Sequence, residues 1–228
     1  MMTRTFFRRL ELEPPAWFYV LMARGPLFRR VYRRFVADLA AGVPQEAHLL
    51  DVGTGPGYLL AYLARQRPDL RLFGLDLSHR MVAGGRRRLA QLAPEARING
   101  LVGNSQALPV RSESFEQVTS TFSFHIWQEP AQAVTEMVRI LKPGGRAWIY
   151  EMNRDADRSH IREFAREEHF PFPFVYLGFH SLAWNHALRS EEFTAVFQQA
   201  GISSWNLARV HHIFWRLEIR RKVDLSRE

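Results

Sequence analysis

The sequence predicts an α/β fold in which helices cover both faces of a doubly wound, mostly parallel sheet. From about residue 48 to residue 152, short apolar runs alternate with stretches of helical periodicity. This alternation is typical of strand–helix–strand units, whose strands are parallel. In the last segment, 213–220, apolar residues instead alternate with mostly charged ones. A period of two predicts one late antiparallel strand.

Size and composition favour one domain with appended elements. The chain has 228 residues, of which 46% are hydrophobic and 24% charged. It has no cysteine, which excludes disulfides, thiolate zinc sites, iron–sulfur clusters and cysteine nucleophiles, and we expect a cytoplasmic protein. The longest early apolar run is Trp17–Met22, much shorter than the ~20 residues that cross a bilayer. We therefore expect neither a signal peptide nor a membrane span.

Positive charge is concentrated near the start of the chain. The net charge is +8, from 31 basic and 23 acidic residues. Residues 1–45 contain eight arginines against Glu11, Glu13 and Asp38. The arginines are Arg4, Arg8, Arg9, Arg24, Arg29, Arg30, Arg33 and Arg34. Such a segment suits phosphate, an anionic lipid surface or an acidic substrate, and a solvated helix face is the alternative interpretation.

The first expected element is a helix over 26–39. Its apolar residues recur at helical spacing, with arginines between them. We assign residues 1–45 to an N-terminal helical cap and residues 46–228 to the main domain.

Five strands are expected in the first part of the main domain. They cover 49–52, 70–75, 98–102, 115–120 and 147–152. Helices are expected over 58–67, from Ser78 and from Pro130. The helix that Pro130 opens should stop at 142–145, because Lys-Pro-Gly-Gly cannot continue it and allows a turn into the next strand.

An insertion after the fifth strand, at about 154–188, interrupts the alternation of strands and helices. It is rich in charge, aromatic residues and histidines, and we interpret it as a lid. These residues are Phe170, Phe172, Phe174, Tyr176, Phe179 and Trp184, with His160, His169, His180 and His186. The aromatic residues suit either the wall of an acceptor site or packing of the lid on the cap helix. A helix that Ser190 caps and Gly201 ends is expected next.

No metal site is expected. The histidines of the insertion lack a compact ligand spacing. His211 and His212 are neighbours on an expected strand, so their side chains should point to opposite faces of the sheet.

The strongest motif is the run from Leu49 to Tyr58, in which a buried strand leads into a glycine-rich turn and then a helix. Glycines in such a turn let the backbone approach a ligand at the carboxyl edge of the sheet. A dinucleotide fingerprint is disfavoured, because Tyr58 stands where G-x-G-x-x-G needs its third glycine. A P-loop is absent, since no Gly-Lys-Ser or Gly-Lys-Thr follows. The run reads D-x-G-x-G-x-G from Asp51 to Gly57.

At this motif the chain resembles the class I S-adenosylmethionine-dependent methyltransferases. The resemblance continues in order through Leu72–Ser78, Val102–Pro109 and Arg139–Gly145, and it covers roughly residues 47–153. The family resemblance implies a Rossmann-like, seven-stranded sheet with S-adenosyl-L-methionine as cofactor. The residues of these motifs are most similar to those of the small-molecule and quinone-type members of the family, which are called methyltransferase type 11.

The resemblance also implies roles for single residues. Asp76 would bind both ribose hydroxyls, Met81 would lie near adenine, and Asn104, where the family has aspartate, would accept a hydrogen bond from the adenine amino group. Asp51 would help to hold the methionine ammonium. In the alternative interpretation, the Asp51 carboxylate only caps nearby backbone amides. The full expected cofactor-binding set is Asp51, Gly53, Thr54, Gly55, Gly57, Asp76, Leu77, Met81, Asn104, Ser105, Gln106 and Thr121.

The expected reaction is methyl transfer to an O, N or C nucleophile of a small, apolar or aromatic acceptor. His125 follows the fourth strand and is the candidate general base, with a wall of the cofactor pocket as its alternative role. Glu151 ends the fifth strand and is a second candidate for facing the acceptor. Two other functions stay open: a nucleic-acid or protein methyltransferase that uses the basic N-terminal face, and a non-catalytic cofactor-binding domain.

Overall fold

A seven-stranded mixed sheet forms the centre of the computed structural model, which describes residues 23–223 apart from 97 and 181–186. The strand order is β3-β2-β1-β4-β5-β7-β6, and β7 runs antiparallel to both of its neighbours. The strands are β1 (His48–Val52), β2 (Arg71–Asp76), β3 (Ile98–Val102), β4 (Phe115–Thr121), β5 (Leu141–Met152), β6 (Trp205–Val210) and β7 (Phe214–Arg220). The predicted α/β class and the late antiparallel strand are confirmed.

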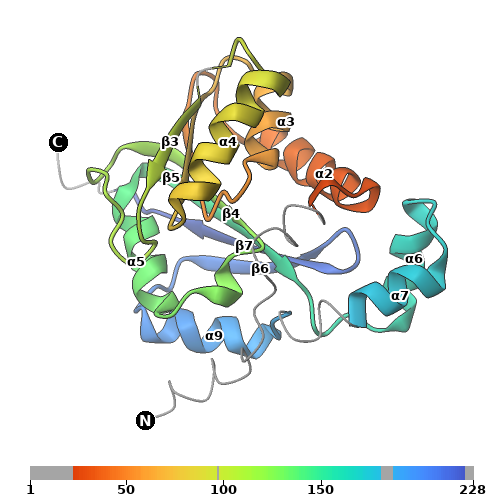
Figure 1. The fold of residues 1–228 in the computed structure, drawn as a ribbon. Helices are drawn as coiled ribbons and strands as arrows, with labels where there is room; N and C mark the ends of the chain where they lie inside the picture. Colours follow the sequence, from red (N-terminus) through yellow and green to blue (C-terminus); the bar gives the residue numbers. More distant parts are fainter. Residues whose placement is uncertain (1–22, 97, 181–186, 224–228) are drawn as a thin grey trace.

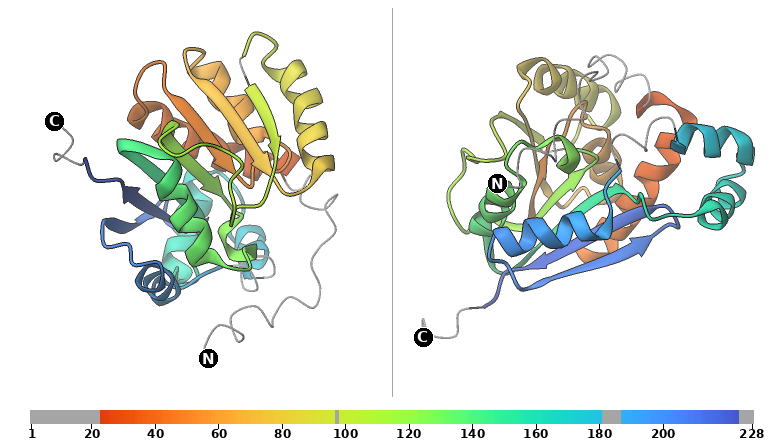
Figure 2. Two further views of the ribbon diagram at one scale, coloured as in Figure 1. Left: turned by 90° about the vertical axis from the view of Figure 1, so that its left-hand side faces the viewer. Right: turned by 90° about the horizontal axis from the view of Figure 1, so that it is seen from below.

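Helices cover both faces of the sheet (Figures 1 and 2). The helices are α2 (Pro26–Gly42), α3 (Tyr58–Gln66), α4 (His79–Leu92), the short 3-10 helix η1 (Phe124–Ile126), α5 (Pro130–Ile140), α6 (Arg158–Glu167), α7 (Phe172–Gly178) and α9 (Ser190–Gln199). The hydrophobic clusters place α2, α3, α4 and α6 on one face, and α5 and α9 on the other. No helix of the described residues is both long enough and apolar enough to span a membrane.

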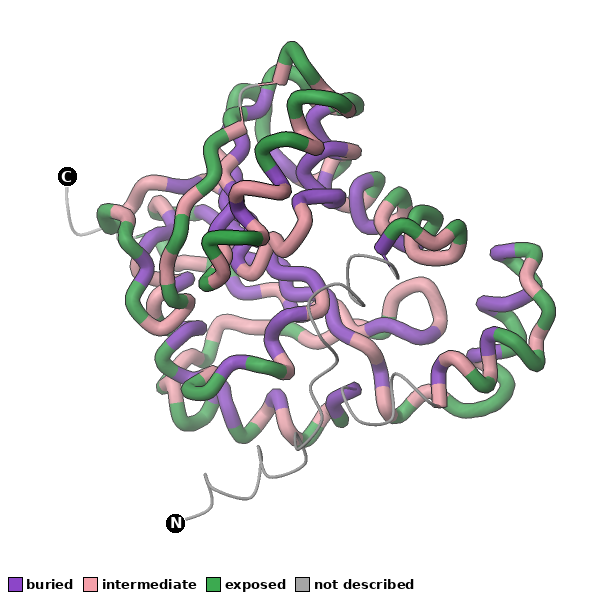
Figure 3. Tube along the Cα trace, viewed as in Figure 1, coloured by how far each residue is buried: buried purple, intermediate pink, exposed green. Residues whose placement is uncertain are grey.

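The two hydrophobic clusters divide the side chains of each central strand between them. In β5, Trp148 and Tyr150 belong to the cluster under α2, whereas Ala147 and Ile149 belong to the cluster under α5. This division follows from the period of two along a strand. Figure 3 shows the resulting concentration of buried positions in the central strands.

The turn between α5 and β5 differs from the prediction. Because Phe115 pairs with Leu141, β5 begins at Leu141, six residues before the expected start at Ala147, and the register then shifts so that Gln117 pairs with Arg146. The glycine-rich turn therefore lies inside the strand as a bulge. Gly144 has a φ of +77°, a conformation that favours glycine.

The cap of α9 is a second correction. Ser190 is the first residue of the helix rather than its cap. Its backbone N–H and its hydroxyl donate to Asp155 Oδ2 at 2.9 and 3.0 Å. The missed signal is an acidic residue 35 positions earlier in the chain, which local sequence patterns do not reveal. The predicted end at Gly201 agrees with its φ of +67°.

The C-terminal hairpin gives a third correction. His211 and His212 do not lie on a strand but form the turn between β6 and β7, with φ values of +47° and +67°. The sequence patterns assign no residues to β6. Several predictions concern residues outside those the structure describes: Trp17–Met22, Arg4, Arg8, Arg9, Trp184 and His186.

Candidate functional site

The glycine-rich turn is held against the end of β2 by backbone hydrogen bonds. The N–H groups of Gly53 and Thr54 both donate to Leu75 O, at 2.8 and 2.9 Å. Gly53, Gly55 and Gly57 all have positive φ, at +75°, +51° and +76°, which favours glycine at each position. A Cβ on Gly53 would also overlap the Ser123 hydroxyl of the segment after β4. The turn thus keeps its backbone close to its neighbours at the carboxyl edge of the sheet.

Asp51, near the end of β1, is a buried carboxylate with incomplete hydrogen bonding. Among the described residues, neither Asp51 Oδ1 nor Thr54 Oγ1 has a hydrogen-bond partner, although both atoms are buried. Burial raises the pKa of Asp51 from 3.8 to about 7, the Thr54 side chain opposes this rise, and the negative charge of Asp76 adds to it. A buried acceptor of this kind suits a cationic ligand, because a positive charge satisfies the oxygen and favours the ionised form.

Asp76 ends β2 and links the turn to the next helix. Its Oδ2 accepts from Gly55 N–H at 2.9 Å, and its Oδ1 accepts from Ser78 N–H at 2.8 Å. Burial raises the pKa of Asp76, and the two backbone hydrogen bonds oppose that rise. Each carboxylate oxygen has lone pairs for a further bond. The carboxylate can therefore accept two ligand hydroxyls while it holds the turn.

Exposed apolar side chains flank Asp76. Leu77 is 72% exposed and Val102, at the end of β3, is 47% exposed. Met81 lies in the first turn of α4, where its N–H donates to the capping Ser78 hydroxyl at 3.4 Å. Apolar side chains in this position provide a surface for a flat, weakly polar group.

The predicted adenine-side residues lie directly after β3. Asn104 Oδ1 accepts from Gln106 N–H at 3.0 Å, and Asn104 O accepts from Ala107 N–H at 3.1 Å. These bonds fix the turn through Ser105 and leave the exposed Asn104 amide at the edge of the sheet. Because β3, β2, β1 and β4 are consecutive neighbours, the structure brings the whole predicted set to one edge.

On the other side of β1, a histidine–carboxylate pair with a fully buried glutamate lies at the ends of β4 and β5. His125 Nδ1 lies 3.1 Å from Glu151 Oε2, and the two side chains are 9% and 0% exposed. Glu151 Oε1 accepts from Phe124 N–H at 2.7 Å and from His125 N–H at 3.4 Å. Glu151 therefore fixes both the ring of His125 and the start of η1.

This pair determines the tautomer of a neutral His125. A carboxylate can only accept, so Nδ1 carries the proton and Nε2 carries the lone pair. The sequence singled out both residues but not their contact. The signal was the position of each at the end of neighbouring strands β4 and β5. Thr121, the last residue of β4, has a buried hydroxyl without a partner among the described residues.

Helix α2 covers this part of the edge through a contact with Phe122, and it is this contact that sequence reasoning missed. Phe28, Tyr32 and Phe35 of α2 contact the ring of Phe122, directly after β4, with centroid distances of 6.0, 6.4 and 5.7 Å. The spacing of these three residues on one helix face was the available signal. Arg24 Nε donates to the hydroxyl of Tyr58, which follows the glycine turn, at 3.2 Å.

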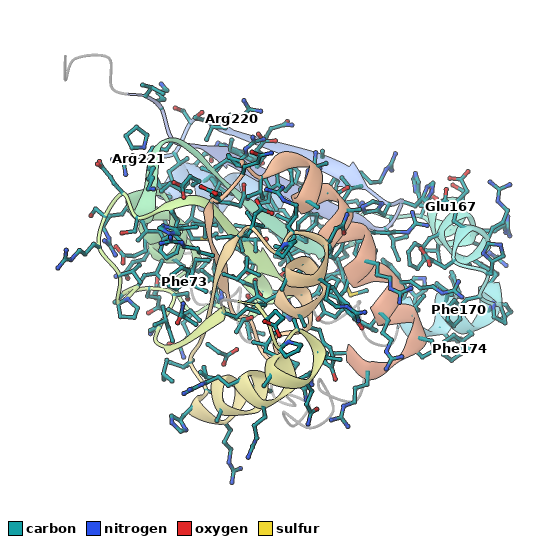
Figure 4. The ribbon with its side chains drawn as sticks, turned by 90° about the horizontal axis from the view of Figure 1, so that it is seen from above. Phe73, Glu167, Phe170, Phe174, Arg220 and Arg221 are labelled. Carbon is teal, nitrogen blue, oxygen red and sulfur yellow. The ribbon has the colours of Figure 1, made fainter. Side chains whose placement is uncertain are left out.

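The insertion contacts α2 as well. Arg34 forms an ion pair with Glu167 at 3.1 Å and a second one with Glu168. Arg30 donates to Glu168 O and lies over the Phe170 ring at 5.2 Å. Figure 4 shows Glu167, Phe170 and Phe174 on the insertion next to α2. The cap helix and the insertion thus meet each other.

The donor set fits S-adenosyl-L-methionine better than a metal. An unpartnered carboxylate, a second carboxylate beside the glycine turn, and exposed apolar side chains match an ammonium, a pair of ribose hydroxyls and a purine, respectively. Within the described residues, no group of three or more histidine, aspartate or glutamate side chains is arranged to hold a metal ion.

Comparison with known proteins agrees with this geometry. Residues 50–149 match the family described as "Methyltransferase domain". The ubiquinone/menaquinone biosynthesis C-methyltransferase UbiE of Geobacter sulfurreducens is 37% identical over 111 residues, which cover 48% of this chain and 43% of that protein. The uncharacterized methyltransferase YdaC of Bacillus subtilis is 30% identical over 118 residues, which cover 52% of this chain and 63% of YdaC. The chain thus matches about half the length of these relatives.

Solved structures share the fold over nearly the whole chain. A candidate S-adenosyl-L-methionine-dependent methyltransferase of Methanococcus maripaludis aligns with a TM-score of 0.70 and 24% identity, covering 93% of this chain and 94% of that chain. A methyltransferase of Aquifex aeolicus aligns with a TM-score of 0.61 and 19% identity, covering 83% and 88%. Residues 50–149 therefore match a methyltransferase domain, and the chain has the fold of solved S-adenosyl-L-methionine-dependent methyltransferases.

Proposed function

We propose that this protein transfers the methyl group of S-adenosyl-L-methionine to an O, N or C nucleophile of a small, apolar or aromatic acceptor. The observation that carries the proposal is the buried Asp51 carboxylate, whose Oδ1 lacks a partner among the described residues, next to Asp76 at the end of the neighbouring strand. A protein retains such a group at a cost in stability, which a cationic ligand offsets.

The expected residues then divide by the part of the cofactor that they contact. Asp76 holds the ribose, Asn104 and Met81 lie at the adenine, and Asp51 holds the ammonium. The glycine turn, with Thr54, supports the chain between them. The remaining predicted contacts are Leu77, Ser105, Gln106 and Thr121. Because these contacts follow the edge from β3 through β2 to β1, the methyl-bearing end of the cofactor would point toward β4.

When bound, the cofactor would supply a methyl group on a positively charged sulfur. An electron pair of the acceptor would form the new bond to the methyl carbon, and the pair of the old carbon–sulfur bond would stay on sulfur. The protein must align the two reactants and exclude water. His125 Nε2 takes the proton that the nucleophile loses, and Glu151 stabilises the resulting imidazolium through Nδ1. Proton and charge then balance within the site.

The acceptor is proposed to enter between the N-terminal cap, residues 1–45, and the inserted lid at about 154–188. Their described parts meet through Arg30, Arg34 and Glu168. The name of the UbiE relative, a C-methyltransferase of ubiquinone/menaquinone biosynthesis, supports an aromatic acceptor. A polyanion is less well supported as acceptor, because one arginine of the basic face, Arg34, is already paired with Glu167 and Glu168 of the insertion.

Calorimetry with S-adenosyl-L-methionine and S-adenosylhomocysteine tests the cofactor part of the proposal. Wild type should bind both, and Asp76→Ala should lose affinity roughly a hundredfold, because two hydrogen bonds to a charged acceptor disappear. Glu113→Ala, an acidic substitution away from this edge, is the matched control and should retain affinity. Binding of a nicotinamide dinucleotide in place of both ligands would refute the proposal.

Turnover tests the acceptor part. Release of S-adenosylhomocysteine should require an added acceptor, and low-molecular-weight phenols and amines should serve where RNA and protein do not. Steep loss of turnover with added salt would instead favour a polyanionic acceptor on the basic face. Absence of turnover with every acceptor class, despite cofactor binding, would leave a non-catalytic domain.

A further inference from the structure

Four aromatic side chains from three distant segments meet beside the glycine turn. We call Phe28, Tyr32, Tyr58 and Phe122 the Phe122 cluster. Phe28 and Tyr32 lie on α2, Tyr58 begins α3, and Phe122 follows β4. Tyr32 lies 6.4 Å from both the Tyr58 ring and the Phe122 ring, and Phe28 meets Phe122 edge to face at 6.0 Å.

The cluster is only half covered by the protein. Phe28, Tyr32 and Phe122 each have intermediate exposure, whereas Tyr58 is buried. Behind the cluster, Phe35 is fully buried and stacks on Tyr150 of β5 at 4.2 Å. The cluster therefore has a rigid back and a partly accessible front.

Phe122 adopts a backbone conformation that is unfavourable for an aromatic residue. Its φ is +55°, in the left-handed region. The conformation is fixed on both sides: Phe122 N–H donates to Tyr150 O at 2.9 Å, and the Ser123 hydroxyl donates to Val52 O at 3.1 Å. Strain of this kind persists where the surroundings over-determine it and is concentrated at functional sites.

Tyr32 lies close to the carboxylate that is proposed to hold the ammonium. Desolvation of its hydroxyl raises the pKa of Tyr32, although the residue as a whole is only partly covered, and the negative charge of Asp51 contributes to the rise. Tyr32 therefore stays a neutral phenol and cannot serve as the base. Its ring contacts those of Tyr58, directly after the glycine turn, and Phe122, directly after β4.

The aromatic residues of the insertion are engaged differently. Phe170 stacks on Phe174, and Phe172 lies 5.4 Å from Tyr176. Arg158 and Arg162 of α6 cover the Phe172 ring at 5.5 and 5.1 Å. Figure 4 places Phe170 and Phe174 on the insertion, beside the outer end of α2. These rings contact one another and nearby guanidinium groups rather than the glycine turn.

We propose that the Phe122 cluster is the wall on which a planar aromatic acceptor packs, and that Phe28 and Tyr32 of α2 determine acceptor specificity. The inference rests on the proposed function, because it takes the carboxyl edge as the reaction site. Offset and edge-to-face contacts with a flat ring would hold its nucleophilic atom between the methyl group and His125. The cap helix is then part of the active site and not only a cover of the core.

The test uses the full chain, with 2-naphthol as the planar probe and ethanolamine as the aliphatic one. Tyr32→Ala should weaken the binding of 2-naphthol to the S-adenosylhomocysteine complex at least tenfold in calorimetry, while the affinity for S-adenosylhomocysteine stays within threefold. Tyr32→Phe, which keeps the ring, should restore 2-naphthol binding to within a few fold. Phe174→Ser, at a site 63% exposed on α7, is the matched control and should change neither affinity.

Three results would overturn the inference. Tyr32→Ala and Phe28→Leu could both bind 2-naphthol as wild type does, Phe174→Ser could abolish its binding, or wild type could methylate ethanolamine and ignore 2-naphthol. In each case the protein remains a methyltransferase with another acceptor wall. Failure of wild type to bind S-adenosylhomocysteine would overturn the proposed function itself. Thermal unfolding of each variant separates loss of the fold from loss of the wall, and Phe28→Leu provides a second variant that keeps apolar volume.

Discussion

The two halves of the carboxyl edge are built in different ways. At the ends of β2 and β3, the bonds that shape the site are mostly local: Asp76 binds the N–H two residues ahead, and Asn104 does the same. At the ends of β4 and β5, His125 binds a carboxylate 26 residues away, and Phe122 packs on α2 and Phe214. The proposed cofactor half of the edge is thus shaped by a local motif, whereas the proposed acceptor half depends on tertiary packing.

The polar groups of the two halves also differ in how deeply they are buried. Asp76 and Asn104 are at least partly exposed, whereas Glu151 is fully buried with three hydrogen-bonding contacts. Substitutions in the cofactor half should therefore reduce ligand affinity and leave the fold intact. Substitutions in the acceptor half should reduce turnover and stability together, because they leave buried polar groups without partners.

The largest expected effect concerns the histidine–carboxylate pair. His125→Asn should lower kcat by roughly 10²–10⁴, the usual contribution of a positioned base, with S-adenosylhomocysteine affinity unchanged. Glu151→Gln should lower kcat and also the melting temperature, since an amide cannot accept from all three donors. The pH profile of kcat for a phenol checks the role: without the base, the rate should rise with pH as the phenol ionises. A His125→Asn variant with wild-type kcat would assign His125 to the pocket wall.

Asp51 should show a conflict between stability and binding. Its folded pKa of about 7 exceeds its ordinary value of 3.8, so the free protein loses stability as the pH rises from about 4 to 7 and carries the full penalty above 7. That penalty is at most about 4 kcal/mol. Asp51→Asn should thus raise the unfolding free energy at pH 8 and not at pH 4, while it weakens S-adenosyl-L-methionine binding.

The matched control for Asp51→Asn is Asp69→Asn. The Arg67 guanidinium, which hydrogen-bonds to both oxygens of Asp69, holds the pKa of that carboxyl far below its ordinary value. Its contribution has the opposite sign: it is present above about pH 4 and is lost as the pH falls. Asp69→Asn should lower stability slightly at pH 8 and leave cofactor binding unchanged. If both variants destabilise the protein at pH 8, the prediction that burial of ionised Asp51 destabilises the protein is wrong.

The same contrast explains what the sequence could predict. Sequence patterns place the strands β1 to β4 to within a residue or so at each end, because strand period, turn glycines and capping residues are local signals. Three misses involve partners far away in the chain: the contact of Ser190 at the start of α9 with Asp155, the histidines of the β6–β7 turn with their carboxylate partners, and the bulge that extends β5. The Phe122 cluster belongs to this group, since nothing local to Phe122 indicates that α2 packs on it.

In the glycine turn, alanine substitutions at Gly53 and Gly55 should have smaller effects on stability, and the two can be compared with each other. Gly53→Ala should cost roughly 1–3 kcal/mol, because alanine is strained at a φ of +75°, and its Cβ would also overlap the Ser123 hydroxyl. Gly55→Ala meets no atom within 4 Å and should cost only its backbone strain. Urea unfolding measures both. Equal costs would mean that contact with the segment after β4 does not constrain the turn.

The smallest effect is expected where the insertion meets the β6–β7 turn. His212 lies between two carboxylates of α6, with Nε2 at 2.8 Å from Glu167 and Nδ1 at 3.2 Å from Glu163. All three side chains are partly exposed, so His212→Gln should cost less than about 1 kcal/mol at pH 7. The pKa of Glu167 is lowered, with His212 as the main cause, so this stabilisation is present above about pH 4.5 and should fade as the pH falls further. Arg34→Gln should cost more, because it leaves the buried Glu168 carboxylate without its guanidinium partner.

Hydrogen exchange in α6 checks this last prediction. A lid must open at small cost, so His212→Gln should speed exchange in α6 and leave β1 and β4 protected. Arg34→Gln should speed exchange in both α6 and α2, because its guanidinium connects the two helices. If His212→Gln instead lowers global stability by several kcal/mol, the insertion folds as part of the core. It could not then move independently, and the acceptor would have to enter past the loops after β4 and β5.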